Sequence, residues 1–169
     1  MSLDGQTIGD QHWADGDTTD GGTGQDVMGL SCGNMAENYH VHFHLSIILN
    51  GGALTVPSHI GIVETSATSE CFYSLHTHDA SGKIHVEAPA ERVFTLGQLF
   101  AIWGQPLARD NVAGMPGLPV KAYVVESGDT AATEYTGELA ALELGSHRDV
   151  TLQIGTPVSA IPTFTWIGD

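Results

Sequence analysis

The segment from residue 40 to residue 50 alternates between two kinds of side chain with a period of two. Its odd positions are all apolar, and its even positions begin with His40, His42 and His44. Because successive side chains of a strand point to opposite faces of a sheet, this pattern predicts a strand with one apolar face and one histidine face. A turn at Asn50-Gly51-Gly52 and a returning strand at 53–57 are expected next. The chain must therefore build a sheet that buries one face in a core.

A second group of histidines lies in a predicted hairpin with strands at 71–78 and 83–88. A loop of two or four residues pairs His76 with His85, and directly opposed residues share a face of the sheet. A loop of odd length would break this register. The side chains expected on one common side are His76, His78, His85 and Glu87.

A helix is predicted over residues 96–103. Thr95 is a suitable N-cap, Gln98 stands where it completes a capping box, and Gly104 provides the stop. The side chains that form a core-facing stripe on this helix are Leu96, Leu99, Phe100 and Trp103.

The later part of the chain predicts strands at 120–126, 138–144 and 149–154, followed by an extended surface segment at 155–168. Two hairpins, one helix and further strands indicate an α+β fold. We expect a mostly antiparallel sheet with one well-capped helix, and a β-grasp-like arrangement is the specific expectation.

The composition divides the chain in two. Residues 1–30 hold six aspartates and no lysine or arginine, which predicts a flexible acidic tail before a single globular domain at 31–169. The formal net charge of −15 argues against binding of nucleic acid or of an anionic membrane through a basic surface. The chain also lacks the apolar stretch of about 18 residues that membrane insertion requires.

The two cysteines, Cys32 and Cys71, are consistent with one disulfide and hence with an oxidising compartment. Two unpaired thiols are the alternative. A soft metal site that uses both thiols is less favoured, because neither cysteine lies in a CxxC spacing.

Six sequence blocks occur in order between Cys32 and Trp166. They are Tyr39–Leu45, Cys71–His78, Gly82–Pro89, Phe94–Gln98, Trp103–Leu107 and Gly155–Pro157. Together they resemble a family of small secreted bacterial proteins of uncharacterised function. The resemblance implies a secreted or periplasmic protein, with the leader not present in this chain, and a disulfide between the two cysteines. Ser74 stands where the family commonly has tryptophan, which puts the packing beside His76 in doubt.

The histidine pattern predicts a metal site. Two histidines at positions i and i+2 of a strand lie on one face, and a third from a neighbouring strand completes a set with an open position for water or substrate. The predicted ligands are His42, His44, His76, His78 and His85. Glu87 is the candidate catalytic base or a carboxylate that supports the ligands, and His40, at the start of its strand, ranks below the others.

Imidazole ligands without a nearby cysteine or methionine favour Zn(II) or Cu(II) over Cu(I), with a slight preference for zinc. The first functional hypothesis is an exported metal-binding protein that acts in metal capture or delivery. The second is a metal-dependent enzyme, hydrolytic or oxidative, and a third is a binding or adhesion module that uses the histidines without metal. The sequence holds no phosphate-binding glycine loop, no GxSxG and no HExxH.

Overall fold

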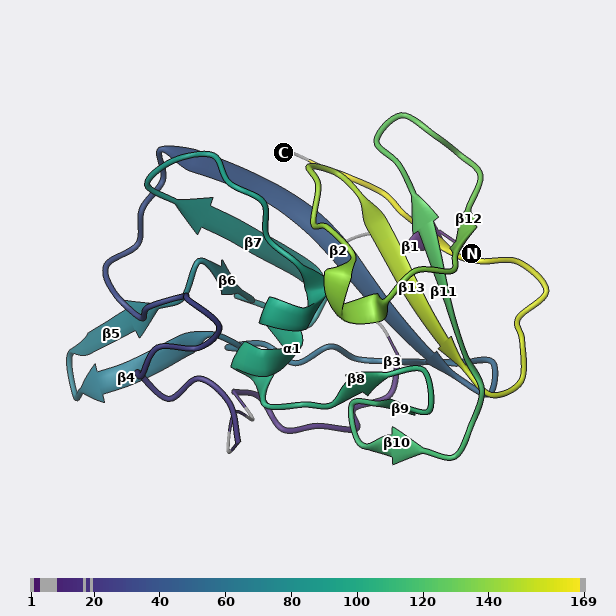
Figure 1. The fold of residues 1–169 in the computed structure, drawn as a ribbon, viewed down its shortest axis with the longest axis horizontal. Helices are drawn as coiled ribbons and strands as arrows, with labels where there is room; N and C mark the ends of the chain where they lie inside the picture. Colours follow the sequence, from purple (N-terminus) through teal and green to yellow (C-terminus); the bar gives the residue numbers. More distant parts are fainter. Residues whose placement is uncertain (1, 4–8, 17, 19, 168–169) are drawn as a thin grey trace.

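The computed structural model describes residues 2–3, 9–16, 18 and 20–167, and its largest element is one sheet. The strands of this sheet are β2 Tyr39–Leu49, β3 Gly52–Leu54, β6 Leu75–His76, β7 Lys83–Ala88, β11 Val120–Val125, β12 Thr133–Tyr135 and β13 Asp149–Ile154. They pair in the order β12-β11-β13-β2-β7-β6, and β3 also pairs with β2 (Figure 1). The long strand β2 therefore lies in the middle of the sheet, between β13 and β7.

The pairing within this sheet is mixed. β2 and β13 run parallel, whereas β2 is antiparallel to β7 and β11 is antiparallel to both β12 and β13. With one α-helix, α1 Leu96–Trp103, among the described residues, this confirms the α+β class and the mostly antiparallel sheet. The β-grasp-like arrangement stays a prediction.

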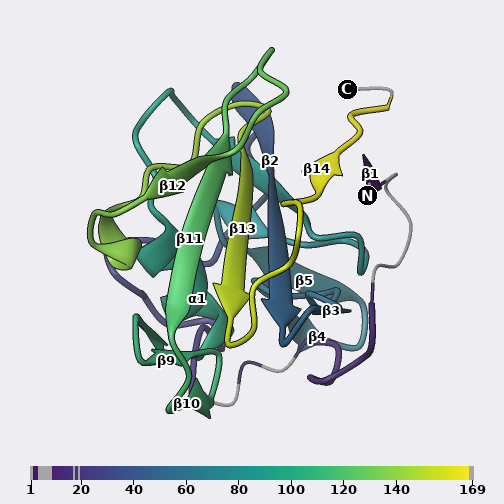
Figure 2. The ribbon, with the colours of Figure 1, turned by 90° about the vertical axis from the view of Figure 1, so that its right-hand side faces the viewer.

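The helix begins and ends where the sequence predicts. Thr95 accepts a hydrogen bond from the backbone N–H of Gln98, the Gln98 side chain accepts from the backbone N–H of Thr95, and Gly104 closes the helix in a left-handed conformation. The predicted stripe is buried, and α1 lies over one face of the sheet (Figures 1 and 2). Phe43, Leu45 and Ile47, the odd positions of β2, are buried in the same core.

Smaller strand pairs surround the sheet. They are the hairpin of β4 Ile62–Ser66 and β5 Ser69–Phe72, the meander of β8 Leu107–Ala108, β9 Asn111–Val112 and β10 Met115–Pro116, and the pair of β1 Ser2–Leu3 with β14 Thr163–Phe164. The strand expected at 71–78 is thus divided between β5 and β6, with residues 73 and 74 between them. The segment 155–167 runs back over the sheet and contains β14, which pairs with β1.

The strand predicted at 138–144 is wrong. This segment contains a 3₁₀ helix, Leu139–Ala141, and its chain pairs with the start of α1 rather than with the sheet: the N–H of Leu96 donates to the carbonyl of Leu142 at 2.8 Å. Leu139, Leu142 and Leu144 are buried. Leu142 and Leu144 alternate as in a strand, but Leu139 does not share their face, and all three pack in the core with α1.

Part of the predicted tail packs against the domain. Trp13 is buried, its ring meets Trp103 edge to face at 4.9 Å, and its indole N–H donates to the carbonyl of Ala113 at 3.2 Å. Leu30 is buried as well. A large aromatic side chain contributes enough apolar area to hold an otherwise polar segment on the core. Residues 1, 4–8, 17 and 19 of the predicted tail lie outside the described residues.

Cys32 and Cys71 form a disulfide, as predicted. Beside it, Gly33 and Phe72 exchange two backbone hydrogen bonds, of 3.0 and 2.8 Å. The bridge therefore joins the segment before β2 to β5, the strand that precedes β6. No described helix has the length and apolar character needed to cross a membrane.

Candidate metal centre

Strand register brings the histidines of three strands to one face of the sheet. His42 of β2 stands opposite His85 of β7, and His85 stands opposite His76 of β6, as the hairpin register predicts. His40 stands opposite Glu87. Because directly opposed residues share a face, the histidine face of β2 and that of the hairpin are one continuous surface.

Three imidazole nitrogens converge at the β2 side of this surface. His40 Nε2 and His42 Nε2 are 3.1 Å apart, and His85 Nδ1 lies 3.4 Å from the first and 3.2 Å from the second. Four donors bound to zinc at about 2.0–2.1 Å stand about 3.3 Å from one another at the corners of a tetrahedron. The triangle thus has the size of one face of a tetrahedral zinc site. We call His40, His42 and His85 the outer group.

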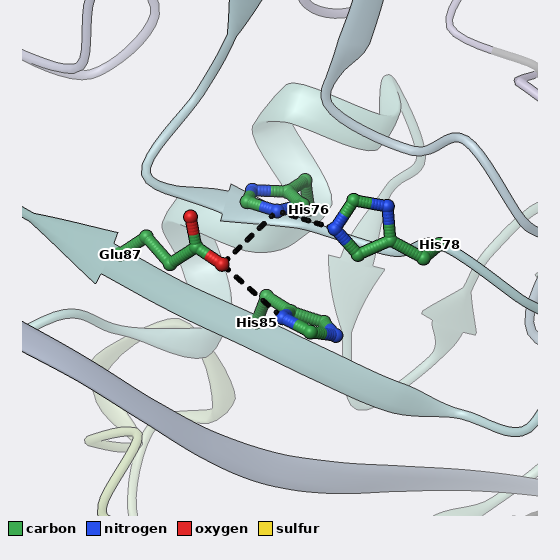
Figure 3. Close-up of side chains that lie close together, drawn as sticks. All are labelled: His76, His78, His85 and Glu87. Carbon is green, nitrogen blue, oxygen red and sulfur yellow. Dashed lines mark hydrogen bonds and ion pairs between the residues drawn. The ribbon is translucent and has the colours of Figure 1, made fainter. Parts of the chain in front are cut away.

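A second group lies at the β6 side and includes a carboxylate. His76 Nε2 is 3.2 Å from His78 Nε2, and Glu87 Oε1 lies 3.7 Å from His76 Nε2 and 3.2 Å from His85 Nδ1. Figure 3 shows these four side chains pointing toward one another from β6, the following loop and β7. Their donor atoms all lie within 4.8 Å of each other. We call His76, His78, His85 and Glu87 the inner group.

The backbone fixes how His76 presents its ring. Its Nδ1 lies 2.9 Å from the carbonyl oxygen of Tyr73, which can only accept, so Nδ1 carries the proton. The lone pair is then on Nε2, which faces His78 Nε2 and Glu87 Oε1. A histidine that binds zinc commonly donates its other ring N–H to a carbonyl or carboxylate in this way. Without a cation, a buried lone pair would face a carboxylate oxygen.

Burial favours the neutral, ligand-competent form of two of these rings. Desolvation lowers the pKa of His76 from its ordinary 6.5 to about 4, and desolvation together with the neighbouring His42 lowers the pKa of His85 to about 3. Desolvation also raises the pKa of Glu87, an effect that His40 opposes. Because a metal binds the unprotonated imidazole, His76 and His85 need release no proton at neutral pH to act as ligands.

We expect the metal-free protein to lose stability as the pH falls below about 6.5. The pKa values of His76 and His85 are lower in the folded than in the unfolded chain, so the unfolded chain binds more protons over this range and acid favours unfolding. The raised pKa of Glu87 acts in the opposite sense, because it lets the folded chain bind a proton more readily. This is the effect of one group, and it opposes the effect of two histidines. Urea denaturation at several pH values between 7.5 and 5 measures how the free energy of unfolding changes with pH. His85→Gln should reduce this pH dependence. An equal pH dependence in parent and variant would contradict the lowered pKa of His85 in the folded chain.

His44, a predicted ligand, lies outside both groups. It is buried with Nδ1 2.8 Å from Asp149 Oδ1 and Nε2 3.0 Å from the carbonyl of Ser81, so both ring nitrogens are engaged. The ring of Phe164 stacks on it at 4.0 Å. Asp149 also accepts from the backbone N–H of Phe164 at 2.7 Å. His44 therefore anchors the C-terminal segment on the sheet.

His44→Ala is expected to lower the free energy of unfolding by about 3 kcal/mol, because it leaves the buried carboxylate of Asp149 without its imidazole partner. It should leave the amount of bound metal unchanged. Urea denaturation measures the first effect and elemental analysis the second. Loss of metal in a variant that remains folded would restore His44 to the ligand set.

His40 is the residue that sequence reasoning underrated. The alternation that selects His42 also places His40 on the same face, and its nitrogen completes the outer group. The remaining histidines, His12, His59 and His147, belong to neither group.

A cavity of about 260 Å³ lies next to the inner group, and His76 and Glu87 form part of its wall. Its other polar lining includes Ser74, Asn34 and Arg92. Glu87 is only 4% exposed, and its Oε2 has no hydrogen-bond partner among the described residues. The carboxylate thus presents one oxygen to the histidines while the other is free to bind a cation or a donor.

No protein-family model matches this chain, and neither a curated protein nor a solved structure is significantly similar to it. The function of the site is therefore inferred from its residues alone.

Proposed function

We propose that this chain is an exported protein that binds Zn(II) or Cu(II) at the histidine cluster and serves in metal capture or delivery. The observation that carries the proposal is the outer group, whose three nitrogens stand 3.1–3.4 Å apart. An imidazole N–H points along one direction only, so three nitrogens in a triangle cannot all hydrogen-bond to one another with good geometry. Glu87 Oε1, 3.2 Å from both His40 Nε2 and His85 Nδ1, can accept from either ring, but a cation above the triangle binds all three nitrogens.

The donor set favours borderline metals. Imidazole suits zinc and copper, and the two cysteines are joined in a disulfide, so no thiolate is present to select Cu(I). The distances of 3.1–3.4 Å between the three nitrogens match those between the ligands of tetrahedral zinc, and zinc is therefore our first choice. Three imidazoles leave one position open for water or for a ligand from a partner that receives the metal.

The exposure of the outer group supports a role in capture. His40 is exposed and His42 and His85 are partly exposed, so an ion can reach all three from solvent. The net charge of −15 raises the local concentration of cations. The disulfide and the resemblance to secreted proteins support export. We also propose a β-grasp-like fold, because α1 lies in the connection between β7 and β11, followed there by β8–β10, while β2 and β13 pair in parallel at the centre.

The test is the affinity of the protein for Zn²⁺ and Cu²⁺, measured by competition with a chromophoric chelator. We expect submicromolar binding by the parent chain and its loss in the double variant His42→Ala/His78→Ala. His12→Ala removes a histidine outside both groups and should bind like the parent. A parent chain that does not compete with the chelator for either ion would overturn the proposal.

The cavity favours a second candidate function, a metal-dependent enzyme in which Glu87 acts as the base. It adjoins His76 and Glu87, and its volume of about 260 Å³, just below the roughly 300 Å³ of the smallest common ligand pockets, restricts it to a small substrate. A metal-bound water beside a carboxylate of raised pKa is the arrangement that hydrolysis uses. This candidate predicts that zinc-loaded protein hydrolyses an activated ester and that Glu87→Gln slows the reaction at equal zinc content. Equal rates for the two proteins would remove it.

A further inference from the structure

The donors of the cluster approach β7 from its two sides. His40 and His42 come from β2, whereas His76 and His78 come from β6 and the loop that follows it. Strand β7 stands between them and contributes His85 and Glu87. Neighbouring strands lie about 4.8 Å apart, so β2 and β6 are separated by roughly twice that distance.

One ion cannot use all six donors. Zinc in proteins takes four ligands, and each unprotonated imidazole nitrogen has a single lone pair. His85 Nδ1 lies 3.2 Å from His42 Nε2, 3.4 Å from His40 Nε2 and 3.2 Å from Glu87 Oε1. We assign its single lone pair to the outer group, where it completes a set of three imidazoles. The inner group then retains two imidazoles that are 3.2 Å apart, His76 and His78, together with the carboxylate of Glu87.

Glu87 is placed to serve both sides. Its Oε1 lies 3.2 Å from His40 Nε2 on one side and 3.7 Å from His76 Nε2 on the other. Its Oε2 is buried and has no hydrogen-bond partner among the described residues. A carboxylate oxygen between two cations reduces their mutual repulsion.

We propose that the cluster binds two divalent cations at once, one on each side of β7. His40, His42 and His85 bind the outer ion, and His76, His78 and Glu87 bind the inner ion. This inference rests on the proposed function, because it adds a second ion to the same cluster. The outer ion sits at the surface and the inner ion adjoins the cavity, so the two positions differ in access to solvent.

The test is the number of zinc ions per chain, measured by elemental analysis after loading with Zn²⁺ and removal of free metal. We expect two ions in the parent chain, one in His42→Ala, one in His78→Ala and none in the double variant. Both positions are partly or fully exposed, so the substitutions leave the core intact. His12→Ala should retain two ions, and circular dichroism checks that each variant is folded.

The outcomes separate this inference from the proposed function. One ion in the parent, lost in either single variant, would mean a single shared ion and would overturn the two-ion inference while the proposed function stands. Two ions that persist in the double variant would place both ions elsewhere and overturn both proposals. No zinc in the parent would overturn the two-ion inference, whereas the proposed function would fall only if the chelator competition also showed no binding of Cu²⁺.

Discussion

Excess Zn²⁺ is expected to raise the free energy of unfolding by about 4 kcal/mol for each site at which the free ion is at 1,000 times its dissociation constant. The reason is that the ligands come from three strands separated in sequence, so the unfolded chain does not hold them together. His40 and Glu87, for example, are neighbours only through the pairing of β2 with β7. Urea denaturation with and without Zn²⁺ measures the difference.

The double variant His42→Ala/His78→Ala is the control for this effect. It keeps the acidic surface and loses donors of both groups, so its stability should not depend on Zn²⁺. An equal gain in parent and double variant would mean that zinc acts through surface carboxylates, and the stabilisation would then say nothing about the histidines.

Removal of the disulfide, by Cys32→Ala/Cys71→Ala, is expected to cost about 4 kcal/mol of stability. The bridge spans 39 residues, and the chain-entropy model gives this value for a loop of that length. Metal affinity should fall as well, because Cys71 lies just before Tyr73, whose carbonyl orients the ring of His76. Urea denaturation and the chelator competition measure the two effects.

Alanine is the suitable replacement because Cys32 and Cys71 are partly buried and need no polar partner once the bridge is gone. The same double variant should lose more stability than His12→Ala, which removes an exposed ring that packs on Trp13. A stability within 1 kcal/mol of the parent would contradict the expectation that the bridge holds the N-terminal segment on the domain.

The local elements of the fold could be predicted because their signals lie within a few residues of one another. The alternation around Phe43 predicts β2, and Thr95 with Gln98 predicts the start of α1. The strand prediction for 138–144 is wrong because only Leu142 and Leu144 alternate as in a strand, whereas Leu139 and Leu142 have the spacing of a 3₁₀ helix. What distinguishes the two is the contact with Leu96, which lies far away in sequence.

The site could be predicted only in part, for a related reason. Hairpin geometry predicts that His76 faces His85, but nothing local indicates that β7 pairs with β2 and adds His40 and His42. Alternation likewise assigns His44 to the histidine face without showing what covers it. Phe164 and Asp149 do so, from more than a hundred residues away, and they engage the ring for packing.

The most direct test of the central claim is X-ray absorption spectroscopy of the zinc-loaded protein. We predict a first shell dominated by nitrogen at about 2.0–2.1 Å, with the outer-shell scattering of imidazole rings. His42→Ala/His78→Ala, loaded in the same way, should lose that imidazole signal. A first shell of oxygen alone in the parent, without imidazole scattering, would contradict the claim that the histidine cluster binds the metal.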